Sequence, residues 1–113
     1  MRTLSLEVSS REESNRRLLA AFEGKPQGNI ISFETPALLF KVLTQKRWEL
    51  IAVLTGAGPV TLREVARRVK RDVKSVHGDV HALLSAGILQ KTEAGRIVFP
   101  FDAVRVNFVI KAA

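Results

Sequence analysis

The 113-residue chain contains no cysteine and no long hydrophobic run. Without cysteine, disulfides and thiolate metal sites are excluded, and the composition fits a reducing compartment. The first ten residues, MRTLSLEVSS, include no apolar stretch long enough for a signal peptide or a membrane-spanning helix. We therefore expect a cytoplasmic protein with no membrane partner.

The sequence also lacks the motifs of common catalytic sites. It contains no glycine-rich phosphate loop, no nucleophile elbow and no evident catalytic dyad. His77 and His81 have a four-residue spacing that metal sites use, but the nearby sequence does not supply the remaining ligands, and Asp79 points elsewhere. Asp72 and Asp79 are interpreted as a helix cap and a surface charge. We expect no enzymatic activity, no cofactor and no metal.

Positive charge is in excess, and it is concentrated in one segment. The formal net charge is +7, and residues 41–91 alone hold ten basic and four acidic residues, whereas residues 1–40 hold five of each. A basic block favours a polyanion such as nucleic acid or an anionic membrane surface. The only aromatic residue in the block is Trp48, which we expect in the core, and this disfavours RNA recognition by base stacking.

The first third of the chain predicts a strand–helix–strand unit. Apolar and polar residues alternate over residues 4–8, which indicates a half-buried strand. Ser10 and Glu13 form a capping box for a helix from about residue 11 to residue 23. Three apolar residues fall on one face of this helix: Leu18, Leu19 and Phe22. The segment GKPQG ends the helix, and a second strand is expected over residues 29–33.

Two short helices are expected next. Thr35 followed by Pro36 starts the first, and Thr44 caps the second. The helical spacing of the second predicts three side chains in the core, Trp48, Ile51 and Leu54, with Leu50 as a further candidate. The stretch GAGP then stops this helix.

From Thr61 the sequence predicts two amphipathic helices separated by a tight turn. Thr61 and Glu64 form a capping box for the first helix. Its apolar face consists of four residues: Leu62, Val65, Ala66 and Val69. Lys70 and Arg71 form the turn, and Asp72 caps the second helix.

The second of these helices separates an apolar face from a polar one. Five residues are expected to face inward: Val73, Val76, Val80, Leu83 and Leu84. Four are expected on the opposite face: Lys74, His77, Gly78 and His81. Gly87 signals the end of the helix. Two amphipathic helices, a tight turn and a polar outer face on the second are typical of a helix-turn-helix.

A hairpin is predicted after these helices, because residues 88–91 and 96–99 flank a loop that contains glycine. The stretch VTLREVARRVKRDVKSVHGDVHALLSAGILQKTEAGRIVFP resembles the winged helix-turn-helix transcriptional regulators, over about residues 44–100. With FETPALLFKVLTQKRWELIAVL before it and PFDAVRVNFVI after it, the chain resembles the predicted prokaryotic winged-helix regulators sometimes encoded beside toxin genes. In winged-helix regulators, a basic or polar residue often stands where Gly78 stands here. This glycine either permits close approach of the backbone to DNA or indicates that the helix reads few bases.

The expected fold class is α+β, in three segments. Residues 1–34 form a strand–helix–strand extension, residues 35–100 a winged helix-turn-helix domain, and residues 101–113 a C-terminal strand. This strand is expected to pair with the N-terminal strands in a second sheet and, with them, to join two subunits into a homodimer. The competing explanation is that these strands only complete the sheet of a single chain.

The charge and the resemblance together predict a sequence-specific regulator of transcription that binds double-stranded DNA as a dimeric repressor. Phosphate contacts are assigned to Arg63, Arg67, Arg68, Lys70, Arg71 and Lys74. Base reading is assigned to Lys74, Ser75, His77, Gly78 and His81. In the hairpin, Lys91 and Arg96 complete the DNA-binding set. The alternatives are an antitoxin-like protein that binds a toxin-like partner and its own operator, a winged-helix protein–protein adaptor, and an RNA binder.

Overall fold

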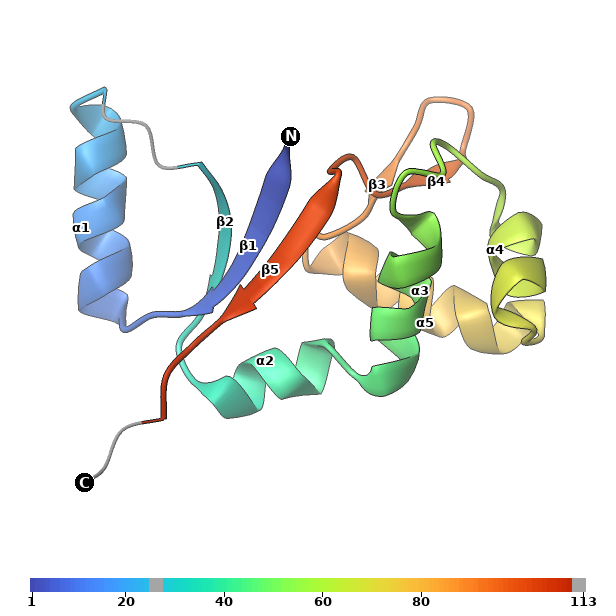
Figure 1. The fold of residues 1–113 in the computed structure, drawn as a ribbon, viewed down its shortest axis with the longest axis horizontal. Coiled ribbons are helices and arrows are strands. Elements are labelled where there is room, and N and C mark those ends of the chain that lie inside the picture. The colour runs from blue at the N-terminus through green and yellow to red at the C-terminus, as the bar shows by residue number, and fades with distance from the viewer. Residues whose placement is uncertain (25–27, 111–113) are drawn as a thin grey trace. The chain divides into compact units, whose positions relative to one another are not determined.

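The computed structural model describes residues 1–24 and 28–110, which form an α+β fold (Figure 1). The helices and strands described in these ranges are, in chain order, β1 (Thr3–Val8), α1 (Arg11–Phe22), β2 (Asn29–Phe33), α2 (Pro36–Val42), α3 (Gln45–Leu54), α4 (Leu62–Val69), α5 (Val73–Ser85), β3 (Gln90–Lys91), β4 (Ile97–Val98) and β5 (Ala103–Asn107). Residues 25–27 of the predicted GKPQG turn and residues 111–113 of the predicted C-terminal segment lie outside the described residues.

The contacts between these elements divide the chain into two units. The first consists of residues 1–41 together with the segment that begins at Ala103, and the second of residues 42–102. In chain order, the second unit is therefore inserted between α2 and β5. The three segments inferred from the sequence, residues 1–34, 35–100 and 101–113, stay a prediction.

The first unit contains a parallel sheet with the strand order β2-β1-β5. This confirms the expectation that the C-terminal strand pairs with the N-terminal strands. Side chains of paired residues in parallel strands point to the same face, so Leu6 lies between Ile31 of β2 and Val106 of β5. Leu4 and Leu6 are buried, which makes this the apolar face. The opposite face carries the polar residues of β1.

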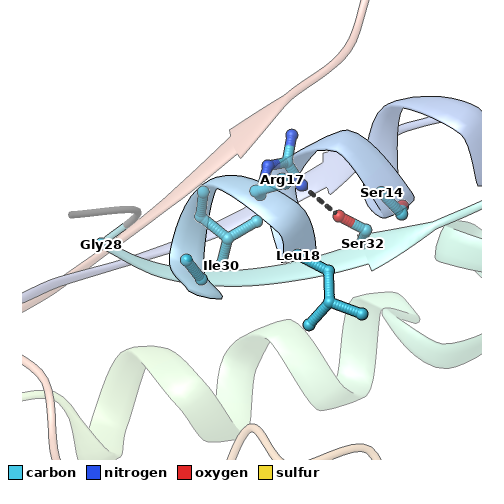
Figure 2. A pocket seen from close by; sticks show the side chains of 7 residues that line it. Ser14, Arg17, Leu18, Gly28, Ile30 and Ser32 are labelled. Carbon is cyan, nitrogen blue, oxygen red and sulfur yellow. Dashed lines mark hydrogen bonds between the residues drawn. The ribbon is translucent and has the colours of Figure 1, made fainter. Parts of the chain in front are cut away.

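Helix α1 lies against the polar face of this sheet and is joined to it by hydrogen bonds from Arg17 (Figure 2). Arg17 donates hydrogen bonds to Ser32 of β2 at 2.8 Å and to Glu7 of β1 at 3.2 Å. No side chain of α1 is buried, and Phe22 is 80% exposed. The prediction that Leu18, Leu19 and Phe22 form a buried apolar face of this helix is therefore wrong, because all three side chains are exposed.

The predicted caps are present in both units. Ser10, Thr44, Thr61 and Asp72 each accept a hydrogen bond from the backbone N–H three residues later. Each cap satisfies one of the N–H groups that a helix leaves without an internal partner at its start. These four short-range signals therefore fix where α1, α3, α4 and α5 begin.

The core of the second unit is formed by α3, α4, α5 and the segments around the hairpin. Its fully buried side chains include Leu50, Ile51, Leu54, Val65, Val76, Leu83, Ile88 and Leu89. Two residues predicted to be in the core are instead exposed: Trp48 by 38% and Val73 by 40%. Both lie in the first turn or so of their helices, where the helical period gives a face but fewer neighbouring elements cover it.

Candidate nucleic-acid interface

The turn between α4 and α5 is closed by backbone hydrogen bonds around a left-handed lysine. Lys70 has φ 57° and ψ 46°, its N–H donates to the Arg67 carbonyl, and the Arg71 N–H donates to the Ala66 carbonyl at 3.1 Å. These two bonds form a Schellman motif, which usually has glycine at the left-handed position. Asp72 then caps α5 directly, so only three residues join the two helices.

A part-buried ion cluster fixes this turn to α3 and α5. Asp79 of α5 accepts a hydrogen bond from Arg47 Nε at 3.0 Å and another from Arg71 Nη2 at 2.7 Å. Its side chain is only 18% exposed. Burial alone would raise the pKa of Asp79, but the hydrogen bonds from Arg71 and Arg47 outweigh it and hold the pKa below its usual value. Asp79 is therefore not the surface charge predicted from the sequence.

Arg71 belongs to this cluster rather than to the exposed surface. Its side chain is 17% exposed, and its Nη1 atom is buried with no hydrogen-bond partner in the part of the chain that the structure describes. The structure thus gives a structural role to a residue that the sequence assigned to phosphate contact. A guanidinium held this way by Asp79 is not presented to a DNA backbone without disrupting the turn.

Arg67 and Arg68 are paired along α4 itself. Glu64 accepts from Arg67 Nη2 at 2.6 Å and from Arg68 Nε at 3.1 Å. The hydrogen bonds from Arg67 and then Arg68 lower the pKa of Glu64 to about 2. Thr61 makes its half of the predicted capping box, but the Glu64 carboxylate binds these two arginines. Their charge is therefore partly neutralised.

Five of the predicted DNA-contacting cations differ from Arg67 and Arg68 because they have no acidic partner among the described residues. They are exposed, and among residues 1–24 and 28–110 none of them forms an ion pair. We call them the unpaired cations: Arg63, Lys70, Lys74, Lys91 and Arg96. They come from α4, the turn, the first turn of α5 and the hairpin.

The exposed stripe of α5 contains the residues assigned to base reading. Lys74, His77 and His81 are exposed, and the two imidazole rings are nearly parallel, with centroids 6.2 Å apart. Gly78 is exposed as well, and a Cβ added there would meet no atom within 4 Å. Ser75 differs, because its hydroxyl donates to Asp72 at 2.9 Å as part of the helix cap.

The predicted hairpin is present, with strands shorter than expected. The N–H groups of Ile88 and Leu89 donate to the Leu83 carbonyl at the end of α5, so the first strand begins only at Gln90. Gly95 has φ +79°, a conformation that its loop requires and that glycine adopts without strain. The N–H groups of Val60 and Ile97 donate to each other's carbonyl groups, which adds the segment before α4 to the hairpin.

The α5 stripe and the hairpin border one cavity of about 270 Å³. Its lining includes His77 and His81 from α5, and Lys91 and Gly95 from the hairpin. The structure thereby brings together residues from both predicted DNA-contacting elements.

Two features of this region were missed from the sequence. Arg47, the partner of Asp79, is 32 positions away in the chain, and no local pattern connects them. The bridge between Val60 and Ile97 was not predicted either, although a β-branched residue just before a helix cap is compatible with a short strand. Both depend on contacts between distant segments.

Neither a cluster of metal ligands nor a membrane-spanning helix is found in the described residues. In residues 1–24 and 28–110, no group of three or more His, Asp or Glu side chains is placed to hold a metal ion. Over the same ranges, no helix has the length and apolar character needed to cross a membrane.

These features define an α+β protein whose second unit contains three helices and a hairpin. The chain belongs to the HVO_A0114 family, whose model matches residues 42–106, more than half of the sequence. The matched segment contains the second unit and most of β5. No curated protein and no solved structure matches the chain significantly.

Proposed function

We propose that this protein binds double-stranded DNA through a winged helix-turn-helix formed by α4, α5 and the β3–β4 hairpin, and that it regulates transcription. The observation that carries the proposal is the continuity between the exposed stripe of α5 and the hairpin, since His77, His81 and Lys91 line the same cavity. In such a module the second helix enters the major groove. Lys74, His77 and His81 then face the bases.

The unpaired cations support the same proposal. Lysine and arginine side chains that are free of acidic partners bind phosphate without first breaking an ion pair, and each contact releases counterions from the DNA. Arg67 and Arg68 contribute less, because Glu64 holds both. Arg71 is excluded from the proposed contact set because of its bond to Asp79.

We further propose that the protein acts as a homodimeric repressor. A two-fold dimer presents two recognition helices about 34 Å apart, which matches successive major grooves on one side of a duplex. Occupation of such a site within a promoter blocks the polymerase from the same DNA. This step rests on the proposed DNA binding.

The test is fluorescence anisotropy of the full chain with the DNA upstream of its own gene, compared with random DNA of equal length. We expect tighter binding to the upstream DNA, and weaker binding to both DNAs as salt rises. His77→Ala and Lys74→Ala should each reduce affinity for the upstream DNA by about 1–3 kcal/mol, with a smaller loss on random DNA.

Arg105→Gln provides the matched control, because it removes one exposed positive charge from β5 in the first unit. We expect this variant to bind as the unchanged protein does. Equal affinity for the two DNAs, or affinity that does not respond to salt, would contradict the proposal.

A second candidate is an antitoxin-like role in which the first unit binds a partner protein. The observation that favours it is the exposed apolar face of α1, Leu18, Leu19 and Phe22, since such patches on a folded surface often mark protein interactions. Co-purification of the full chain with the product of a neighbouring toxin-like gene, and its loss in Phe22→Ser, would support this role. A complex unaffected by Phe22→Ser would contradict it.

A further inference from the structure

The cavity between α5 and the hairpin has the chemistry of a small-molecule site. Four apolar residues contribute to its lining: Leu62, Val80, Leu84 and Ile97. Val80 and Ile97 are buried, so they form its floor. His77, His81 and Lys91 are exposed and form a polar rim. Pockets of this kind, with an apolar body and a few converging polar groups, are typical of small-ligand sites.

The rim selects for a negatively charged group. Lys91 offers an ammonium that has no ion-pair partner in the described ranges, residues 1–24 and 28–110. A neutral imidazole offers one N–H donor, so His77 and His81 add donors to the same rim. None of the described residues that line the cavity is acidic. Charge-assisted hydrogen bonds from such donors are stronger than neutral ones, which favours an anion over an uncharged polar group.

The apolar floor and the volume of the cavity determine the size of the ligand and the apolar character of its body. A space of about 270 Å³ lies near the lower end of the range for small-ligand sites and suits a molecule of roughly ten non-hydrogen atoms. A free phosphate would leave the apolar floor without a partner. A transition metal would find only the two imidazoles, because no third ligand is grouped with them in the part of the chain that is described.

We propose that this cavity binds a small carboxylic acid with an apolar, ring-sized body, and that its occupation competes with DNA. The carboxylate would bind Lys91 and the imidazole N–H groups, and the apolar body would lie on Val80, Leu84 and Ile97. The competition rests on the proposed function, because the same rim side chains are assigned there to DNA. Such a ligand would act as an inducer for a repressor.

The test of the cavity is an NMR titration of the ¹⁵N-labelled full chain with benzoate. We expect saturable shifts of the backbone amides around His81, Gly95 and Ile97, with a Kd on the order of 1 mM for a ligand of this size. Benzyl alcohol lacks the charge and acetate lacks the apolar body, and each should bind about tenfold more weakly.

Two variants, Lys91→Gln and the control Arg105→Gln, test whether the carboxylate of benzoate binds Lys91. Lys91→Gln should weaken benzoate binding by about tenfold and leave benzyl alcohol unchanged. Arg105→Gln, which removes an exposed charge from the first unit, should leave both unchanged. Shifts that do not saturate, shifts centred on other residues, or equal binding of benzoate and benzyl alcohol would overturn the assignment.

The competition is measured separately, by anisotropy with upstream DNA at constant ionic strength. Saturating benzoate should weaken DNA binding by at least about tenfold in the unchanged protein, because a filled rim is unavailable to DNA. Unchanged DNA affinity with a saturated cavity would overturn the competition. Failure to bind DNA in the benzoate-free arm would overturn the proposed function instead, and the NMR result would stand by itself.

Discussion

Asp79 determines how the helices of the second unit are held. A carboxylate that has lost most of its contact with water is destabilised unless charged partners offset the loss of hydration. Arg47 from α3 and Arg71 from the turn provide these partners, at 3.0 and 2.7 Å. One side chain of α5 thereby connects the turn that precedes this helix and α3, which is distant in sequence. The orientation of the exposed stripe of α5 depends on this connection.

The first prediction concerns Asp79→Asn. The change leaves two guanidinium groups with a neutral partner. Breaking a fully buried ion pair costs about 3–5 kcal/mol, and for this part-buried cluster we expect the lower end of that range, about 3 kcal/mol. We expect urea denaturation at pH 7 to show a loss of that size in the free energy of unfolding. Arg105→Gln, at an exposed position, should leave that free energy within about 0.5 kcal/mol of the original value.

The lowered pKa of Asp79 gives this prediction a pH dependence. Because the pKa is lower in the folded protein than in the unfolded chain, the stabilisation is present above the unfolded value, about 3.9, and is lost as the pH falls through the folded value. The difference in stability between the unchanged protein and Asp79→Asn should therefore shrink below about pH 4. A difference that stays constant from pH 7 to pH 3 would contradict the assignment. Glu64 and Asp72 are present in both proteins, so their titration cancels from the difference in stability.

The second prediction concerns Gly78→Ala. Glycine inside a helix costs about 1 kcal/mol relative to alanine, and the space around a Cβ at this position is open. We therefore expect the free energy of unfolding to rise by about 1 kcal/mol. If the backbone at Gly78 approaches the DNA closely, the more stable variant will bind upstream DNA more weakly. Unchanged DNA affinity would show that α5 does not need this glycine for contact.

At the scale of elements, the turn from α4 to α5 combines a strained residue with an exposed charge. Lys70 is the only residue other than glycine with positive φ in residues 1–24 and 28–110. A side chain in this conformation costs about 1–2 kcal/mol, and strain of this kind is often found at functional positions. The left-handed backbone closes the Schellman motif, and the side chain remains free to contact phosphate.

The third prediction separates these two roles of Lys70. Lys70→Gly should raise the free energy of unfolding by about 1 kcal/mol by relieving the strain, and Lys70→Ala should not. Both variants should flatten the log–log dependence of DNA binding on salt by about 0.9, because both remove one phosphate contact. Chemical denaturation and anisotropy titrations measure the two effects. An unchanged salt slope in both variants would remove Lys70 from the proposed interface.

Elements were predictable where their signals are local. The caps at Ser10, Thr61 and Asp72 each require a partner only three residues away, and the structure contains all of these bonds. Periodicity defines the faces of a helix but does not say what covers them, so the exposure of Trp48 and of the apolar face of α1 was not evident. Arg17 illustrates the reason, because its partners in β1 and β2 become visible only once the sheet is formed.

The sequence predicted which residues belong to the candidate site, but it did not predict which of them form ion pairs. Sequence spacing placed Lys74, His77 and His81 on one face of α5, and the structure agrees. It did not distinguish Arg71, which Asp79 holds, from Lys70, which remains unpaired. That distinction depends on a contact between α5 and the turn, and on Arg47 from α3. Ion pairs that local spacing does not reveal therefore distinguish Arg71 from the unpaired cations of the proposed interface.

At the scale of the whole molecule, the two units determine how dimerisation should be tested. β5 pairs with β1 over its whole length, and β1 contributes the buried Leu4 and Leu6. Deleting the chain after Phe101 would therefore remove a strand from the sheet of the first unit as well as any subunit contact. A truncated chain would not separate loss of the dimer from loss of the sheet. The full chain has to be measured instead.

The last prediction uses the number of unpaired cations to determine how many subunits bind DNA. Each phosphate contact contributes about 0.9 to the log–log salt slope. The five unpaired cations of one subunit therefore contribute about 4.5, and Arg67 and Arg68 raise the one-subunit limit to about 6. A dimer on two half-sites approaches about 9 from its unpaired cations alone. For the proposed dimer we expect a slope clearly above the one-subunit limit. Light scattering at micromolar concentration should give twice the 12.5 kDa mass of one chain. A mass of one chain with and without DNA, together with a slope at or below the limit, would contradict the dimer and leave DNA binding by a single subunit.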